Sequence, residues 1–153
     1  MCQSAGMPPS YPERQRTLGS LLRQPYRALQ DRTYAALAQR GFDDLRAAHS
    51  AVFRHIRPEG SRVTELAAQA GMTKQSMSYL VDALVRGGYL HIVPDPADGR
   101  AKLARLTPRG EQAMAALIEL SLEWERRLAR RLGAAKVAQL RELLEETIAA
   151  VER

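Results

Sequence analysis

The sequence predicts a mainly α-helical fold with one two-stranded β hairpin, and three observations support this prediction. Apolar residues recur at the spacing of amphipathic helices in the first and last thirds of the 153-residue chain. Glycines end two of the inner helical segments, one at Gly71 and the other at Gly87 and Gly88. Between residues 89 and 106 the pattern changes to two short apolar runs around a polar segment, which is typical of a hairpin.

Composition indicates one compact unit and favours an anionic partner. Of the 153 residues, 45% are hydrophobic, which is enough for one core. Lysine and arginine outnumber aspartate and glutamate by 23 to 17, a balance that would attract a polyanion such as double-stranded DNA. No apolar run approaches the roughly 18 residues of a membrane span, and the start of the chain lacks an apolar signal segment. We therefore expect a cytoplasmic protein with no membrane association.

The first third is expected to hold a tail and two helices. Residues 1–16 contain several prolines and show no helical period, so we interpret them as a flexible tail. The segment 17–44 carries one long helix, from Thr17 to about Arg40, that Pro25 bends or interrupts and Gly41 ends. A second helix is predicted over residues 43–56, with Asp43 as its capping residue.

The middle of the chain carries two helices joined by a tight turn. Thr64 is expected to cap a short helix, and Gly71 supplies the left-handed residue that ends it. In a helix-turn-helix, a short helix and a tight turn are followed by a second helix that buries one face and enters the DNA major groove. This chain has such a second helix. It is predicted over residues 73–86, and its apolar face consists of Met77, Leu80, Val81, Leu84 and Val85.

The exposed N-terminal part of helix 73–86 supplies candidate contacts to DNA. Side chains there can exchange hydrogen bonds with base edges, while the helix dipole favours a phosphate. The alternative is an ordinary solvated helix face, and the adjacent turn and hairpin favour DNA contact over it. The candidate residues are Thr73, Lys74, Gln75, Ser76, Ser78 and Tyr79.

A two-stranded wing is predicted after this helix, with strands at residues 89–93 and 103–106 and a polar tip between them, at residues 94–102. Arg100 and Lys102 are expected at the tip, where a hairpin can insert a guanidinium into the narrow minor groove. We expect Asp98 to pair with Arg100 and support the wing, because an unpaired carboxylate beside DNA would repel phosphate. A polar surface hairpin without DNA contact is the alternative.

Two motifs in this region resemble the multiple antibiotic resistance regulator (MarR) family. They are Asp-Pro-Ala-Asp-Gly-Arg-Ala-Lys-Leu at residues 95–103 and Leu-Thr-Pro-Arg-Gly at residues 106–110. The resemblance implies a sequence-specific transcriptional regulator, with a repressor favoured, whose winged helix-turn-helix lobe spans residues 45–107. The family pattern usually has a second arginine where this chain has Gly99, and often an arginine where it has Tyr79, so two cations are missing from the expected DNA face.

Two helices that carry apolar stripes are predicted in the last third of the chain, within residues 108–153. Thr107 caps the first of them, and Pro108 takes its first position. The apolar residues recur at near-heptad spacing and expose more apolar surface than a small wing domain can cover. We therefore expect a second copy of the chain to cover this surface, and packing within one chain is the alternative. The stripe residues are Met114, Leu117, Ser121, Trp124 and Leu128, then Val137, Leu140, Leu144, Thr147 or Ile148, and Val151.

The resemblance adds an assembly and a ligand to these helices. It implies that residues 17–44 and 108–153 form the dimerisation unit of a homodimer, which sets two recognition helices about 34 Å apart on an inverted repeat. It also implies a small aromatic or phenolic effector bound between these helices and the DNA-binding lobe. Candidate residues, which are aromatic and, except for Phe53, also carry a polar group, are Tyr34, His49, Phe53 and Trp124; a core or interface role is the favoured alternative for each.

Little in the sequence indicates catalysis. The histidines His49, His55 and His91 are not at metal-ligand spacing, and no phosphate loop or nucleophile motif is present, so we expect no enzyme activity, cofactor or metal. Some proteins of the resembled family sense oxidants through a cysteine in the first helix. The single cysteine here, Cys2, lies in the predicted tail, so we interpret it as a surface thiol. Two other functions stay open: a winged-helix protein-interaction module without specific DNA binding, and a redox or ligand sensor whose output is not transcriptional.

Overall fold

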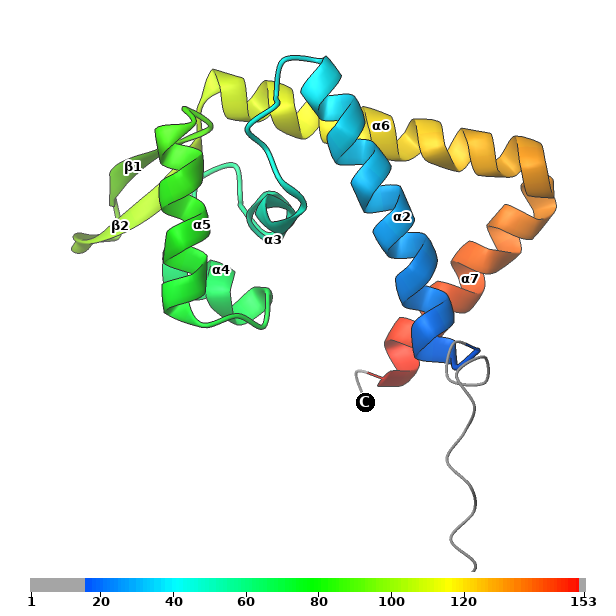
Figure 1. The fold of residues 1–153 in the computed structure, drawn as a ribbon. Coiled ribbons are helices and arrows are strands. Elements are labelled where there is room, and N and C mark those ends of the chain that lie inside the picture. The colour runs from blue at the N-terminus through cyan, green and yellow to red at the C-terminus, as the bar shows by residue number, and fades with distance from the viewer. Residues whose placement is uncertain (1–15, 152–153) are drawn as a thin grey trace, which may run out of the picture.

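The computed structural model describes residues 16–151, which form a small lobe carried by three long helices (Figure 1). The long helices are α2 (Leu18–Gln39), α6 (Pro108–Leu132) and α7 (Ala134–Val151). The lobe contains the 3₁₀ helix η1 (Ala47–His49), the helices α3 (Ser50–Phe53), α4 (Val63–Gln69) and α5 (Lys74–Arg86), and the strands β1 (Leu90–Asp95) and β2 (Asp98–Leu106). In Figure 1 the lobe lies at one end of α6, and α7 folds back from the other end.

The predicted class, mainly α-helical with one two-stranded hairpin, is confirmed. The tail predicted for residues 1–16, with Cys2, lies outside the described residues except for Arg16. Within residues 16–151, no helix combines the length and the apolar character needed to cross a membrane.

Helix α2 runs over 22 residues without a break, as the apolar period predicted. The hydroxyl of Thr17 caps it by accepting a hydrogen bond from the amide of Ser20 at 3.4 Å. Pro25 lies inside the helix and does not end it. The buried residues of α2 all belong to its second half, so this half packs against the rest of the chain; they are Thr33, Tyr34 and Leu37.

The helix predicted over residues 43–56 is wrong in its start and length. This segment forms only the three-residue η1 and the four-residue α3. Asp43 is not the cap: the capping position is Arg46, whose backbone amide donates to Nδ1 of His49 at 3.0 Å. Burial lowers the pKa of His49, which favours the unprotonated nitrogen that this hydrogen bond needs.

The capping residue predicted for the next helix is also wrong. Helix α4 begins at Val63, so Thr64 lies inside its first turn and Arg62 takes the capping position. The carboxylate of Glu65 supplies the acceptor by bonding to the Arg62 amide at 3.4 Å, which explains the earlier start. Gly71 follows the helix with φ 62°, the left-handed conformation that was predicted for it.

Helix α5 buries the face that its period predicted. Met77, Leu80, Val81 and Leu84 are buried in the core of the lobe, and Val85 packs against that core. The helix ends at Gly87, after which Tyr89 is only 1% exposed. The core therefore joins α5 to α4, to the wing and to the start of α6 through one set of apolar contacts.

The wing is a longer hairpin than predicted. β1 and β2 pair antiparallel from Leu90 with Leu106 to Pro94 with Lys102, so most of the predicted polar tip is strand. The turn at the end contains only Pro96 and Ala97, between the two strands. Polar and apolar side chains alternate over residues 100–103, and this was the sequence signal that could have extended β2.

Helix α6 begins as predicted, with Pro108 at its first position and the Thr107 hydroxyl accepting from the Gly110 amide at 3.0 Å. Apart from Leu120, its buried face is made of small residues beside the predicted stripe, which lets α6 approach the lobe and α2 closely. The fully buried residues are Gly110, Ala113, Ala116 and Leu120, while Met114 and Leu117 are partly buried. Gly133, with φ 93°, separates α6 from α7.

Candidate nucleic-acid interface

The N-terminus of α5 presents an exposed polar surface. Thr73 caps the helix by accepting from the Ser76 amide at 3.1 Å, and its hydroxyl donates to the Ser76 hydroxyl at 2.9 Å. Lys74, Gln75 and Tyr79 are exposed, and Tyr79 keeps 70% of its surface. Ser78 is half-buried and lies at the edge of this surface.

Sequence reasoning missed two residues on the same face of α5. Asp82 and Arg86 are exposed and follow Gln75 at the spacings i+7 and i+11, which continue one helix face. A carboxylate can accept a hydrogen bond from the cytosine amino group, but it repels phosphates. The helical period extended past Tyr79 was the signal that could have found both residues.

The wing carries its two candidate cations on one face of β2. Arg100 and Lys102 are both exposed and stand two residues apart, so their side chains point to the same side of the strand. Gly99 precedes them in open surroundings, because a Cβ there would meet nothing within 4 Å. Packing within residues 16–151 therefore does not require glycine at this position.

The predicted pairing of Asp98 with the Arg100 side chain is wrong. One oxygen of Asp98 accepts from the backbone amide of Arg100 at 3.1 Å, and the other lies 3.6 Å from the guanidinium of Arg62. The carboxylate thus contacts the turn and the lobe, and within residues 16–151 the exposed Arg100 guanidinium forms no ion pair. Arg62 was missed because it lies far from the wing along the chain.

A second set of contacts fixes the lobe on the long helices. The hydroxyl of Tyr89 donates to Asp44 and accepts from Arg109 at 3.0 Å. Burial and the Asp44 carboxylate raise the pKa of Tyr89, so its hydroxyl keeps its proton. The Arg109 guanidinium also stacks 4.8 Å from the centroid of the Tyr89 ring. This joint connects the loop after α2, the end of α5 and the start of α6.

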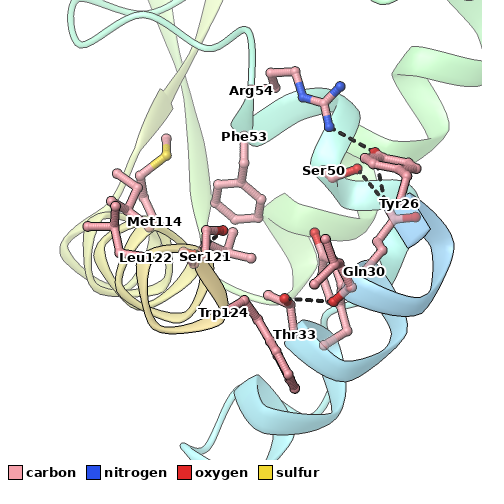
Figure 2. Close-up of a pocket in the computed structure, with 14 residues that line it drawn as sticks. Tyr26, Gln30, Thr33, Ser50, Phe53, Arg54, Met114, Ser121, Leu122 and Trp124 are labelled. Atoms are coloured by element: carbon pink, nitrogen blue, oxygen red, sulfur yellow. Dashed lines mark hydrogen bonds between the residues drawn. The ribbon is translucent and has the colours of Figure 1, made fainter. Parts of the chain in front are cut away.

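An apolar cavity of about 490 Å³ opens between α2, α3 and α6 (Figure 2). Its polar edge is ordered by two hydrogen bonds, from Gln30 to the Ser50 hydroxyl at 3.1 Å and from Arg54 to the Tyr26 hydroxyl at 2.9 Å. We name it the α2–α6 cavity; its lining residues are Tyr26, Leu29, Gln30, Thr33, Tyr34, Ser50, Phe53, Arg54, Met114, Leu117, Ile118, Ser121, Leu122 and Trp124.

Three of the four candidate ligand residues line this cavity. Tyr34, Phe53 and Trp124 do so, whereas His49 lies outside its lining and caps η1. The Tyr34 hydroxyl is buried and forms no hydrogen bond of normal length among the described residues, although the Ser50 side chain lies close enough to oppose the rise of its pKa. Burial raises the pKa of Tyr34 to about 12, so this hydroxyl is a neutral donor at physiological pH.

No group of three or more histidine, cysteine, aspartate or glutamate side chains in residues 16–151 is placed to hold a metal ion. The features that do converge are a capped helix with an exposed polar end, a tight turn before it and a hairpin with two exposed cations after it. Together they define a winged helix-turn-helix protein.

Comparisons with known proteins agree with this class. Residues 43–101 match the model of the MarR family. The matched segment covers the helix-turn-helix and most of the wing, so this lobe is similar to the MarR family, as the sequence motifs predicted. No curated protein matches the chain.

Solved structures show the same fold. MarR from E. coli in its apo form is 25% identical with a TM-score of 0.70, over 86% of this chain and 96% of that one. The regulator Tm0710 from Thermotoga maritima is 27% identical with a TM-score of 0.60, over 87% and 92% of the two chains. The transcriptional repressor CouR, solved bound to a 23-mer DNA duplex, has a TM-score of 0.68 at 21% identity, over 96% and 100%.

Proposed function

We propose that this chain is a cytoplasmic transcriptional repressor that binds an inverted-repeat operator as a homodimer. The segment 73–86 enters the major groove, and the wing segment 94–102 enters the adjacent minor groove. The observation that carries the proposal is the exposed end of α5, with Lys74 and Gln75, beside a wing that exposes Arg100 and Lys102. The similar fold of CouR, solved on duplex DNA, supports this use of the lobe.

The dimer is proposed from apolar surface that one chain leaves uncovered. Large apolar side chains are exposed along the first half of α2 and along α7 from Leu140 onward. Contiguous surface of this kind marks an interaction site, and both helices belong to the segments expected to dimerise. The exposed residues are Leu18, Leu21, Leu22, Tyr26 and Leu29 on α2, and Leu140, Leu143, Leu144, Ile148 and Val151 on α7.

Selection from random duplex DNA tests the proposal. The purified protein is expected to enrich an inverted repeat whose half-sites lie about one helical turn, ~34 Å, apart. Binding of the enriched duplex should weaken steeply as salt rises, because cations on the protein displace counterions from phosphates. Failure to enrich any sequence would contradict sequence-specific binding.

Replacing Arg100 with alanine is expected to weaken operator binding about tenfold. The plot of log affinity against log salt should become shallower by about 0.9 if one phosphate contact is lost, and any preference for A·T pairs at the wing should fall. Titration of labelled operator at several salt concentrations measures both. Arg130→Ala, which removes an exposed arginine from the far end of α6, is the matched control and should bind as the wild type does. Equal behaviour of the two variants would remove the wing from the proposed interface.

We also propose that a small aromatic or phenolic effector occupies the α2–α6 cavity and releases the protein from DNA. The cavity lies between helices of the proposed dimer unit and α3 of the lobe, so a ligand there can change their spacing. Its apolar walls suit an aromatic ring, and the Tyr34 hydroxyl, which forms no hydrogen bond of normal length among the described residues, can donate to a carboxylate or phenolic oxygen.

A panel of benzoic acids and phenols, titrated into the protein–operator complex, tests the effector. At least one compound is expected to lower operator affinity. The Tyr34→Phe variant should require about tenfold more of that compound for the same effect, because it binds the compound less tightly. The variant should bind operator normally and unfold no more easily than the wild type, because it removes a buried hydroxyl that forms no hydrogen bond of normal length among the described residues. If the same compounds release the wild type and the Tyr34→Phe variant from DNA at equal concentrations, the effector binds outside the α2–α6 cavity.

A second candidate function is a winged-helix module that binds another protein and has no sequence-specific DNA binding. The specific observation in its favour is the outward face of α5, where Tyr79 replaces a cation and Asp82 adds a negative charge. Weak duplex binding that does not respond to salt would favour this function over the repressor.

A further inference from the structure

Arg62 holds the wing from outside it. This residue stands at the capping position of α4, and its guanidinium reaches Asp95, the last residue of β1. Nε and Nη2 of Arg62 both donate to Oδ2 of Asp95, at 2.8 and 2.5 Å. Nη2 also lies 3.6 Å from the Asp98 carboxylate on the other side of the turn. One guanidinium therefore connects α4 to both strands of the hairpin.

The two carboxylates are in turn fixed to the wing backbone. Oδ1 of Asp95 accepts from the Ala97 amide at 2.8 Å, and Oδ1 of Asp98 accepts from the Arg100 amide at 3.1 Å. Each carboxylate thus uses one oxygen for the turn and the other for Arg62. The Ala97 amide and the Arg62 guanidinium lower the pKa of Asp95, so it stays ionised wherever the protein is folded near neutral pH.

A backbone contact one residue earlier completes the attachment. Ser61 and Ala104 exchange hydrogen bonds at 3.0 and 2.9 Å, so the middle of β2 is tied to the chain just before α4. Ser61 is 1% exposed, so its contact is buried, whereas the Arg62 side chain keeps 37% of its surface and covers a buried Asp95 from the solvent side. The hairpin is therefore held at its middle by Ser61 and near its tip by Arg62.

We propose that Arg62 is a positioning residue that sets the angle between the wing and the recognition helix α5. The inference rests on the proposed function, in which α5 and the wing contact neighbouring grooves of one duplex. Helix α4 packs directly against α5, so a wing fixed to the start of α4 is fixed relative to α5. Arg62 acts through Arg100 and Lys102, whose distance from the minor groove depends on that angle.

Arg62 variants separate this role from a direct contact with DNA. Arg62→Met removes the ion pairs but keeps an apolar stem, and Arg62→Lys keeps the charge but cannot donate the two-nitrogen fork. Arg57→Met is the matched control, because Arg57 lies in the same loop and pairs with Glu65 at 2.7 Å instead of with the wing. Affinity is measured on the selected operator and on a version with G·C pairs at the positions next to the wing.

Arg62→Met is expected to lose about tenfold in affinity for the selected operator, together with most of the discrimination against the G·C version. Arg62→Lys should lie between the wild type and the methionine variant, and Arg57→Met should match the wild type. Thermal unfolding of each variant separates lost positioning from lost folding. If Arg62→Met does not fold, Arg62→Lys, which leaves the buried Asp95 neutralised, still reports the discrimination.

A double-mutant cycle decides between the two roles of Arg62. On an Arg100→Ala, Lys102→Ala background, Arg62→Met should have no further effect, because the groups that it positions are gone. The inference would be overturned if Arg62→Met lowered operator affinity equally on both backgrounds, kept the discrimination against the G·C version, and made the plot of log affinity against log salt shallower by about 0.9. That result would show that Arg62 contacts phosphate itself. If the wild type binds no duplex, the proposed function fails. If Arg100→Ala weakens binding and Arg62→Met does not, only the positioning role fails.

Discussion

Replacing Gly110 with alanine is expected to lower the free energy of unfolding by about 3 kcal/mol or more. A Cβ at this position would lie 2.1 Å from the carbonyl oxygen of Tyr89 and 3.0 Å from a methyl carbon of Leu106. The oxygen cannot give way easily, because it accepts a hydrogen bond from the Thr107 amide at 3.0 Å, next to the residue that begins α6. The added methyl group would therefore push α6 away from the lobe at the joint of Tyr89 with Asp44 and Arg109.

Urea unfolding, followed by circular dichroism at one fixed protein concentration, measures this loss. Gly19→Ala is the matched control, because Gly19 lies inside α2 and a Cβ there would meet nothing within 4 Å. That variant is expected to gain about 0.5 to 1 kcal/mol, since alanine loses less backbone entropy than glycine in a helix. A Gly110→Ala protein that unfolds within about 1 kcal/mol of the wild type would show that α6 can shift at this joint without cost.

The sequence predicted those parts of the fold that local signals specify. The apolar period of α5 gave its buried face, because a helix repeats its contacts every three to four residues. Thr107 and Pro108 gave the start of α6 in the same way, through preferences that act within one turn. The capping predictions for Asp43 and Thr64 are wrong because several polar residues stand near each helix start, and the acceptors that cap the helices, His49 and Glu65, lie three residues after the capping position.

The parts of the candidate site that were missed depend on contacts between distant segments. Asp98 was assigned to Arg100, its neighbour along the chain, whereas its ion pair is with Arg62, which approaches only when α4 packs beside the wing. The α2–α6 cavity could not be predicted for the same reason, since helices from both ends of the chain form it. Asp82 is different: the helical period already placed it on the outward face of α5, and extending that face would have found it.

A pair of charges on the apolar face of α7 is expected to have the largest effect on DNA binding. Leu140 and Ile148 lie two turns apart on one side of the helix, and they keep 42% and 54% of their surface in the single chain. If a second copy covers them, Leu140→Glu with Ile148→Glu places two carboxylates in an apolar interface, where desolvation opposes assembly. The double variant should be monomeric at concentrations at which the wild type is a dimer, as sedimentation or light scattering would show.

The loss of the dimer should weaken operator binding about 100-fold or more, because the second lobe then binds without the high effective concentration that the first lobe gives it. Ala138→Glu with Ala149→Glu is the control of equal charge, since both alanines are exposed on the opposite side of α7. Its self-association should be unchanged, and its affinity should fall only by the modest repulsion of two added charges from phosphate. If instead both double variants stay dimeric and bind alike, the apolar face of α7 is not the seam, and the leucines of the first half of α2 become the surface to test. A monomer that keeps wild-type affinity would contradict two-lobe recognition itself, because a single α5 and wing would then account for all of the binding.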